Sequence, residues 1–397
     1  MRKKMKNIIA IFFLSLTLLF TISCSYMKTD LGDETIDVSI TQIKTSSGDT
    51  GVILSFNTVS SNLEIPDIVQ GLPVLKLSFS KTSNMSNLFS IAIPSSVTEI
   101  DTFKGATSLE NVELPNSITN LPSFSGCTKL KSVIIPETIT EIPESCFENC
   151  KALKSVSKPT TSDSTESGES LNGIKEIGKS AFSNCSALKT IALETTSITN
   201  LNEQTFYNCS LLSTITLPET IQSVASEAFS GCTALTEVNG FELITSLASV
   251  NTKIFNSCKN LSSITVNTQV EVIPADMFNG CTSIRTFIIP ENVTEIGSSA
   301  FAATSLEELY CYSSTPPKIS KTSLPEMKVE EEKKTEDKKE STTDEEKIEN
   351  SEESEKEVIY KKVFTLYIPN ESESLYKEKW DDLVDWRVID IKTLPKE

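Results

Sequence analysis

Apolar residues recur along most of this chain in one long repeating pattern. A phenylalanine marks each unit, and successive phenylalanines lie 21 to 26 residues apart, except for one interval of 35. The nine are Phe103, Phe124, Phe147, Phe182, Phe206, Phe229, Phe255, Phe278 and Phe301. No helix or strand has so long a period, whereas one turn of a solenoid does. The pattern therefore predicts a repeat protein.

Each unit combines a strand pattern with a turn pattern. Val133 and Ile135 alternate as in a short strand, and Pro136 ends it because proline cannot donate a ladder hydrogen bond. Phe147 and Cys150 follow at a spacing typical of a single helical turn. One unit alone buries too little apolar surface to offset the conformational entropy lost on folding, about 1.5 kcal/mol per residue. Neighbouring units must therefore stack.

The predicted fold class is an α/β solenoid that is mostly β. It is a leucine-rich-repeat array of about ten repeats, each of ~23 residues, with short parallel strands and single helical turns. The alternative is an ordinary globular α/β domain. Nine phenylalanines and seven cysteines in phase argue against that alternative.

The repeat resembles that of the bacterial BspA-like leucine-rich-repeat family. The best local matches are Ile177–Leu188 and Phe287–Phe301; Cys311–Pro317 resembles the family's closing element, and Leu366–Ile389 its terminal cap. The resemblance implies a curved solenoid with strands on one face, and a surface or secreted binding protein of the kind discussed as adhesins. One departure is Thr304, which stands where the repeat has cysteine.

Composition divides the chain into five predicted parts. They are a lipoprotein signal peptide (1–23), a polar tether (24–44), the solenoid (45–320, with a loop insert at 157–171), an acidic disordered insert (321–357) and a C-terminal cap (358–397). Within the acidic insert, Glu326–Glu357 holds 15 acidic and 7 basic residues, a net charge of 7 − 15 = −8. Such a segment buries too little apolar surface to fold alone.

The N-terminus carries the features of an export signal. Basic residues precede the apolar run Ile8–Phe20, which is too short for a comfortable membrane span. The run leads to Cys24, in a context that resembles a bacterial lipobox, so Cys24 is the predicted lipid-attachment residue. The alternative is an ordinary signal peptide cleaved nearby. Ser25 is not the aspartate that retains lipoproteins at the inner membrane, which favours the outer membrane and cell surface.

Charge and composition exclude several classes of function. The net charge is −18, which repels phosphate backbones and anionic lipids, so neither nucleic acid nor a membrane surface beyond the acyl chains is an expected partner. The chain has no histidine, which removes Ser-His-Asp, Cys-His and H-E-x-x-H chemistry. We therefore expect no enzyme, no cofactor and no metal site.

Seven of the phenylalanines are followed three residues later by a cysteine. These ladder cysteines are Cys127, Cys150, Cys185, Cys209, Cys232, Cys258 and Cys281. Free cysteine behaves as a small hydrophobe, so we expect buried free thiols. One or two disulfides between neighbouring rungs are the alternative.

The outward strand positions are small and rich in serine and threonine. This ribbon suits broad contact with a protein or glycan, whose identity the sequence does not reveal. The candidate binding residues are Ser132, Ile134, Thr190, Thr214, Thr216, Thr265 and Ile288. The alternative for these residues is plain soluble strand surface, and the alternative function is a periplasmic scaffolding lipoprotein.

Overall fold

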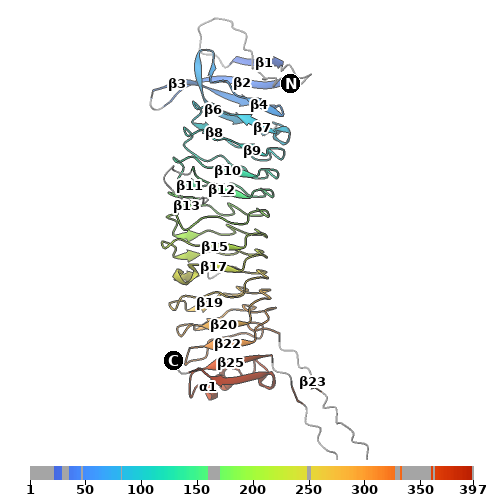
Figure 1. Cartoon of the computed structure of the whole chain (residues 1–397), viewed down its shortest axis with the longest axis vertical. Helices are drawn as coiled ribbons and strands as arrows, with labels where there is room; N and C mark the ends of the chain where they lie inside the picture. The colour runs from blue at the N-terminus through green and yellow to red at the C-terminus, as the bar shows by residue number, and fades with distance from the viewer. Residues whose placement is uncertain are drawn as a thin grey trace, which may run out of the picture.

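The predicted solenoid is confirmed by a computed structural model, in which the chain forms a long stack of coils (Figure 1). Some of the predicted parts lie outside the residues that the structure describes. These parts are the signal peptide before Ile22, the tip of the loop insert and most of the acidic insert. The described residues are 22–28, 35–45, 48–81, 83–159, 170–247, 252–326, 331–332, 359–360 and 363–395.

Each coil has three sides, and two of them are lines of short parallel strands. The first ladder contains the predicted strands, whose side chains alternate between core and solvent, as in Ser132–Ile134, where only Val133 is buried. Its strands are β4 (Asn62–Glu64), β7 (Ser90–Ala92), β9 (Asn111–Val112), β10 (Ser132–Ile134), β12 (Ser155–Ser157), β15 (Thr214–Thr216), β17 (Glu237–Asn239), β20 (Thr286–Ile289), β22 (Glu308–Cys311), β25 (Phe364–Ile368) and β26 (Ile389–Thr393).

The second ladder is made of strands of two residues, one exposed and one mostly buried. It uses the Val-Thr-Glu-Ile part of the repeat, so Ile142 is buried whereas Glu141 faces solvent. Its strands are β8 (Glu99–Ile100), β11 (Glu141–Ile142), β13 (Glu176–Ile177), β14 (Asn200–Leu201), β16 (Ser223–Val224), β18 (Ser246–Leu247), β19 (Val272–Ile273) and β21 (Glu295–Ile296).

The third side, which we call the turn side, contains the phenylalanines. Their rings form one stack, with centroids of successive rings 5.3–5.9 Å apart. The stack begins earlier than predicted, because Phe56 and Phe79 precede Phe103 in it. Burying a large ring at every rung gives the coil a continuous core.

The backbone on the turn side is bonded from rung to rung. Ser145, Phe147 and Asn149 each donate an N–H group to a carbonyl of the next repeat, at 2.8 Å. The expected turn is present as a β-turn closed by the Cys150 N–H and the Phe147 carbonyl, 3.0 Å apart. Asn149 has φ +62°, a conformation that asparagine and glycine tolerate best. This explains why asparagine or glycine usually precedes the ladder cysteine.

The ladder cysteines are buried, as predicted, and their thiols are hydrogen-bonded. Each donates to the carbonyl of the phenylalanine in the preceding repeat, for example Cys209 Sγ to Phe182 O at 3.1 Å. The same contact recurs for all seven, at 3.1–3.2 Å. A thiol is thus small enough for the rung and still supplies a weak donor to a buried carbonyl.

The N-terminal end corrects the predicted tether. Residues 35–44 form strand β2 (Thr35–Lys44), in which Ile36, Val38 and Ile40 are buried. β2 pairs antiparallel with β1 (Ile22–Lys28) and with β3 (Thr50–Phe56). β3 pairs with β6 (Leu72–Phe79), which also pairs with β5 (Ile68–Val69) and β8. Because Ile36, Val38 and Ile40 face the core and Val38–Lys44 pairs with β3, β2 belongs to the folded domain.

The C-terminal end closes the stack across the acidic insert. β25 pairs with β22, although some fifty residues separate them, and β26 pairs with β25. The helix α1 (Glu373–Trp380) packs beneath them, and its Trp380 Nε1 donates to Pro317 O at 2.9 Å. The remaining elements are β23 (Glu331–Glu332) with β24 (Ile359–Tyr360), and the 3-10 turns η1 (Met85–Asn87), η2 (Phe241–Leu243) and η3 (Trp386–Val388).

Burial should make the ladder thiols unreactive. It raises the pKa of Cys127, Cys232 and Cys281 to about 12. We expect iodoacetamide at about pH 8, near the ordinary pKa of a thiol, to label none of the nine described cysteines in the native chain and all nine in guanidinium chloride, as counted by mass spectrometry. Native labelling, or a mass deficit from a disulfide, would contradict this.

The same shifts imply a dependence of stability on pH. A thiol whose pKa is higher in the folded chain stabilises it fully below the ordinary thiol pKa of 9.0. The free energy of unfolding should therefore fall as pH rises from about 9 towards 12, and should fall less steeply in a Cys127→Ala/Cys232→Ala/Cys281→Ala variant. Equal slopes would show that the thiols do not cause the fall.

Candidate binding face

The exposed side chains of the first ladder form a continuous surface, which we call the strand face. All seven candidate residues are exposed on it. Ser132 and Ile134 lie on β10, Thr214 and Thr216 on β15, and Ile288 on β20. Thr190 and Thr265 occupy the equivalent positions in repeats where this segment is not assigned as a strand. The candidates therefore form a line along the stack and not a compact cluster.

Hydroxyl groups elsewhere on the solenoid are used in its construction. Thr220 Oγ1 donates to Ile198 O at 2.7 Å, and Thr138 Oγ1 to Ile118 O at 3.0 Å, each in the preceding repeat. Hydroxyls at other positions of the repeat also donate to backbone carbonyls of the preceding repeat. They include Ser96, Ser117, Thr128, Ser210, Thr233 and Thr282.

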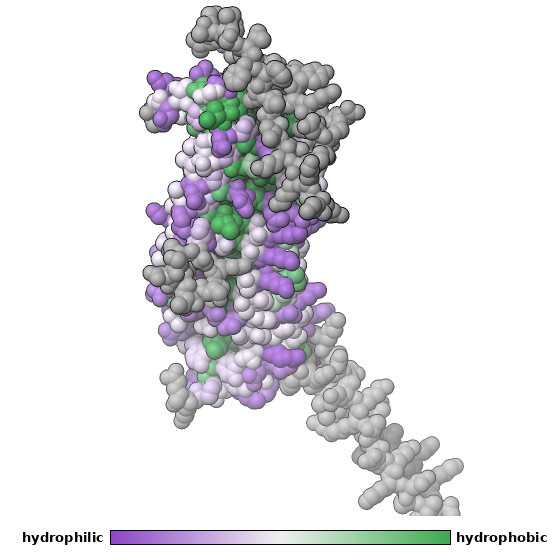
Figure 2. Space-filling model, turned by 45° about the horizontal axis from the view of Figure 1, so that its top comes forward, coloured by the Kyte–Doolittle hydropathy of each residue, from purple (hydrophilic) through white to green (hydrophobic). Residues whose placement is uncertain are grey.

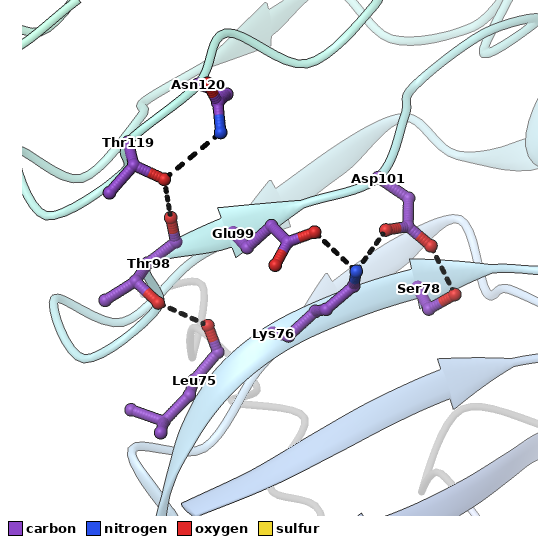
Figure 3. A network of polar contacts seen from close by, with 8 residues as sticks. All are labelled: Leu75, Lys76, Ser78, Thr98, Glu99, Asp101, Thr119 and Asn120. Carbon is purple, nitrogen blue, oxygen red and sulfur yellow. Dashed lines mark hydrogen bonds and ion pairs between the residues drawn. The ribbon is translucent and has the colours of Figure 1, made fainter. Parts of the chain in front are cut away.

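A close view around β6 and β8 shows polar groups that are bonded between neighbouring coils (Figure 3). Thr98 Oγ1 donates to Leu75 O at 3.2 Å, and Thr119 Oγ1 donates to Thr98 O at 3.3 Å. Lys76 forms ion pairs with Glu99 and Asp101. The hydrogen bond that Lys76 donates to Glu99 is the largest cause that raises the pKa of Lys76 above its ordinary value.

The hydroxyls of the strand face differ in this respect. Among the described residues, the side chains of Ser132, Thr190, Thr214, Thr216 and Thr265 make no hydrogen bond within the chain. They are exposed donors and acceptors on a rigid support. The chemistry available to them is hydrogen bonding to a ligand, with Ile134 and Ile288, 58% and 55% exposed, as isolated apolar contacts.

Large exposed apolar residues lie in different coils, for example Ile134 on β10, Leu211 before β15 and Ile288 on β20. Figure 2 shows hydrophobic patches separated by pale and hydrophilic residues on the face in view. Within the part of the chain that the structure describes, no group of three or more His, Cys, Asp or Glu side chains is placed to hold a metal ion. The described residues also contain no helix long and apolar enough to cross a membrane.

Sequence reasoning missed one feature at the C-terminal end of this face. Tyr310 on β22 and Tyr367 on β25 stack with ring centroids 4.3 Å apart, and both hydroxyls donate to Glu308. Desolvation is the largest cause that raises the pKa of Tyr310 to about 12. On the side of Tyr310 away from Tyr367, the register partner of Tyr310 is Ile288 on β20. The sequence does contain a tyrosine at the outward position of both segments, Leu309-Tyr310 and Leu366-Tyr367. The acidic insert separates the two segments, so their pairing could not be read from the sequence.

The predicted lipid-attachment residue lies at the opposite end of the molecule. Cys24 falls in β1, as the register partner of Val38 on β2. Its side chain is outside the described part of the structure, and its acylation stays a prediction.

The repeat assigns the chain to a family. The profile of the BspA type leucine rich repeat region matches six copies, over residues 76–170, 162–249 and 212–324. The chain belongs to the BspA-type leucine-rich-repeat family. These matches cover well over half of its length.

A comparison of this BspA-type chain with solved structures finds several bacterial proteins. A leucine-rich repeat protein from Bacteroides ovatus is 18% identical, with a TM-score of 0.48, over 91% of this chain and 100% of its own. A leucine rich cell surface protein from Faecalibacterium prausnitzii is 20% identical, with a TM-score of 0.40, over 75% and 91%. The pneumococcal vaccine antigen PcpA is 14% identical, with a TM-score of 0.44, over 95% and 100%. No curated protein matches the chain.

Two isosteric substitutions separate structural hydroxyls from free ones. Thr220→Val removes the hydrogen bond to Ile198 O and should lower the free energy of unfolding by about 1 kcal/mol. Thr216→Val, which removes an unbonded exposed hydroxyl, should change it by less than about 0.5 kcal/mol. Urea unfolding followed by circular dichroism measures both. An equal loss in the two variants would mean that Thr216 also serves the fold.

Proposed function

We propose that this protein is a non-enzymatic cell-surface lipoprotein that binds a protein or glycan partner through the strand face. The observation that carries the proposal is the line of exposed, unbonded hydroxyls from Ser132 to Thr265, in a fold that engages many of its other hydroxyls between repeats. Polar groups that the fold does not need are free to exchange water for a ligand. Each coil adds one more contact row, so affinity can accumulate along the stack.

The proposed location of the protein in the cell follows from its N-terminal sequence. The apolar run and Cys24 have the order of a lipoprotein signal, and acyl chains at Cys24 would hold the N-terminal end of the stack at a membrane. Cys24 lies in β1, next to the first coils, so the strand face would extend away from the bilayer along the stack. An outer-membrane position facing outward would bring that face to host or neighbouring-cell surfaces.

The anchor has a direct test in the native bacterium. Wild-type chain should take up an alkyne-tagged fatty acid and sediment with the envelope, whereas Cys24→Ala should do neither. A Cys146→Ala variant, which removes a buried cysteine, is the matched control and should keep the label. Protease added to intact cells should remove the wild-type chain and spare a periplasmic protein. Protection until the envelope is broken would replace the surface proposal with the periplasmic scaffold.

Binding through the strand face has a separate test. Mature chain is applied to printed arrays of glycans and of extracellular-matrix proteins. We expect Thr214→Gln/Thr216→Gln/Thr265→Gln to weaken the binding signals by about tenfold or more, since these longer neutral side chains remove the hydroxyls and obstruct the face.

The matched control places three glutamines on the second ladder, as Asn200→Gln/Ser246→Gln/Val272→Gln, at exposed positions away from the strand face. Its array signals should equal those of the wild type. Absence of any array signal, or equal loss in both variants, would contradict binding by this face.

A further inference from the structure

A column of lysines borders the strand face at its middle. The residue before each outward strand position is Lys131, Lys154 or Lys189 in three successive repeats, and all three are exposed. Backbone contacts keep them in register, because the Lys154 N–H donates to Lys131 O at 2.8 Å. Ser186, three residues before Lys189, donates its hydroxyl to Lys151 O at 3.4 Å, which places the third repeat on the second.

Most of this positive charge has no ion-pair partner among the residues that the structure describes. Two further exposed lysines, Lys129 and Lys151, lie just before Lys131 and Lys154. Glu110 pairs with Lys131 at 2.6 Å, and the hydrogen bond from Lys131 lowers the pKa of Glu110. The other four lysines make no ion pair with any described residue. Elsewhere the same column pairs opposite charges, as in Arg285 with Glu307.

Like charges on neighbouring rungs cost stability unless something neutralises them. Adjacent rungs lie about 4.8 Å apart, and like charges directly opposite each other in a sheet are destabilising. The chain as a whole is at −18, so excess acidic residues were available to pair with these lysines. The neighbouring strand face supplies none. Between Glu113 and Glu237 its outward residues are all uncharged. They are Ser132, Ile134, Ser155, Ser157, Thr190, Ala192, Thr214 and Thr216.

The structure assigns this stretch a ligand class. We propose that the lysine column and the adjoining hydroxyls bind an acidic polysaccharide, through its carboxylate or sulfate groups. This proposal rests on the proposed function of the strand face and names the chemistry of its partner. A polymer whose charge repeats along its length matches lysines that repeat at the rung spacing, and Ser132, Ser155 and Thr190 can bond sugar hydroxyls beside them.

Nucleic acid fits the same stretch less well. Single strands bind by stacking their bases on exposed aromatic side chains. Between residues 129 and 192 the aromatic residues are Phe147 and Phe182, and both are buried in the ring stack.

The test uses the mature full chain and isothermal titration calorimetry. The probes are heparin fragments and polygalacturonate, with dextran, polyglutamate and a single-stranded oligonucleotide for comparison. We expect one or both acidic polysaccharides to bind, with an affinity that falls as salt rises. Dextran should not bind. Lys154→Gln/Lys189→Gln should weaken the affinity by about tenfold or more.

The matched control removes two exposed lysines from the turn side, as Lys104→Gln/Lys253→Gln, with the same change in net charge. It should bind within about twofold of the wild type. Unfolding curves of both variants check that the fold is kept. Equal weakening in both variants would overturn the location. Binding of polyglutamate or the oligonucleotide as tight as that of the polysaccharides would overturn the ligand class.

Failure of this proposal is distinguishable from failure of the proposed function. If neither polysaccharide binds, but array signals still depend on Thr214, Thr216 and Thr265, the strand face binds a different ligand and the lysine proposal falls alone. If the array signals are absent as well, both proposals fall.

Discussion

Each coil of this solenoid leaves backbone groups that only its neighbours can satisfy. The N–H of Phe147 has its partner in Ala181 of the next repeat, and the carbonyl of Phe147 accepts the thiol of Cys185. Buried amides and carbonyls must be paired, so adjacent coils are held at the spacing of hydrogen-bonded strands, about 4.8 Å. That spacing then governs the side chains. Rings stack on their equivalents in neighbouring repeats, whereas the ladder thiols and several hydroxyls donate to backbone carbonyls of the preceding repeat.

This constraint gives the abundance of serine and threonine two different causes. Thr98, Thr138 and Thr220 donate to carbonyls of preceding repeats, so their hydroxyls substitute for strand hydrogen bonds where the backbone turns. Thr214 and Thr216 lie on β15, which pairs with β17, and their exposed hydroxyls have no hydrogen-bond partner among the described residues. Composition alone cannot separate these two groups. Their places in the rung do.

The repeat, its strands and the buried phenylalanines and cysteines followed from the sequence because each recurs in phase over many units. Features that depend on geometry or on distant segments did not. The second ladder has strands of two residues, such as Glu141–Ile142, too short to show alternation. Strand β2 has polar residues between its apolar ones, so its sequence is like that of a polar tether. Only its pairing with β3 in the structure shows that it is a strand of the folded domain. Tyr310 and Tyr367 meet because the cap returns to the stack after the acidic insert.

A solenoid also fixes the height of every outward residue, so different stretches of one face can carry different chemistry. The middle of the strand face has lysines at its border, most of them without an ion pair to any described residue, and no outward carboxylate between Glu113 and Glu237. The C-terminal end has the stacked tyrosines, bonded to Glu308. Several coils separate the two stretches, and residues that share no contacts contribute independently to binding. An elongated partner could therefore engage both stretches at once, whereas a compact one would meet a single stretch and depend on that chemistry alone.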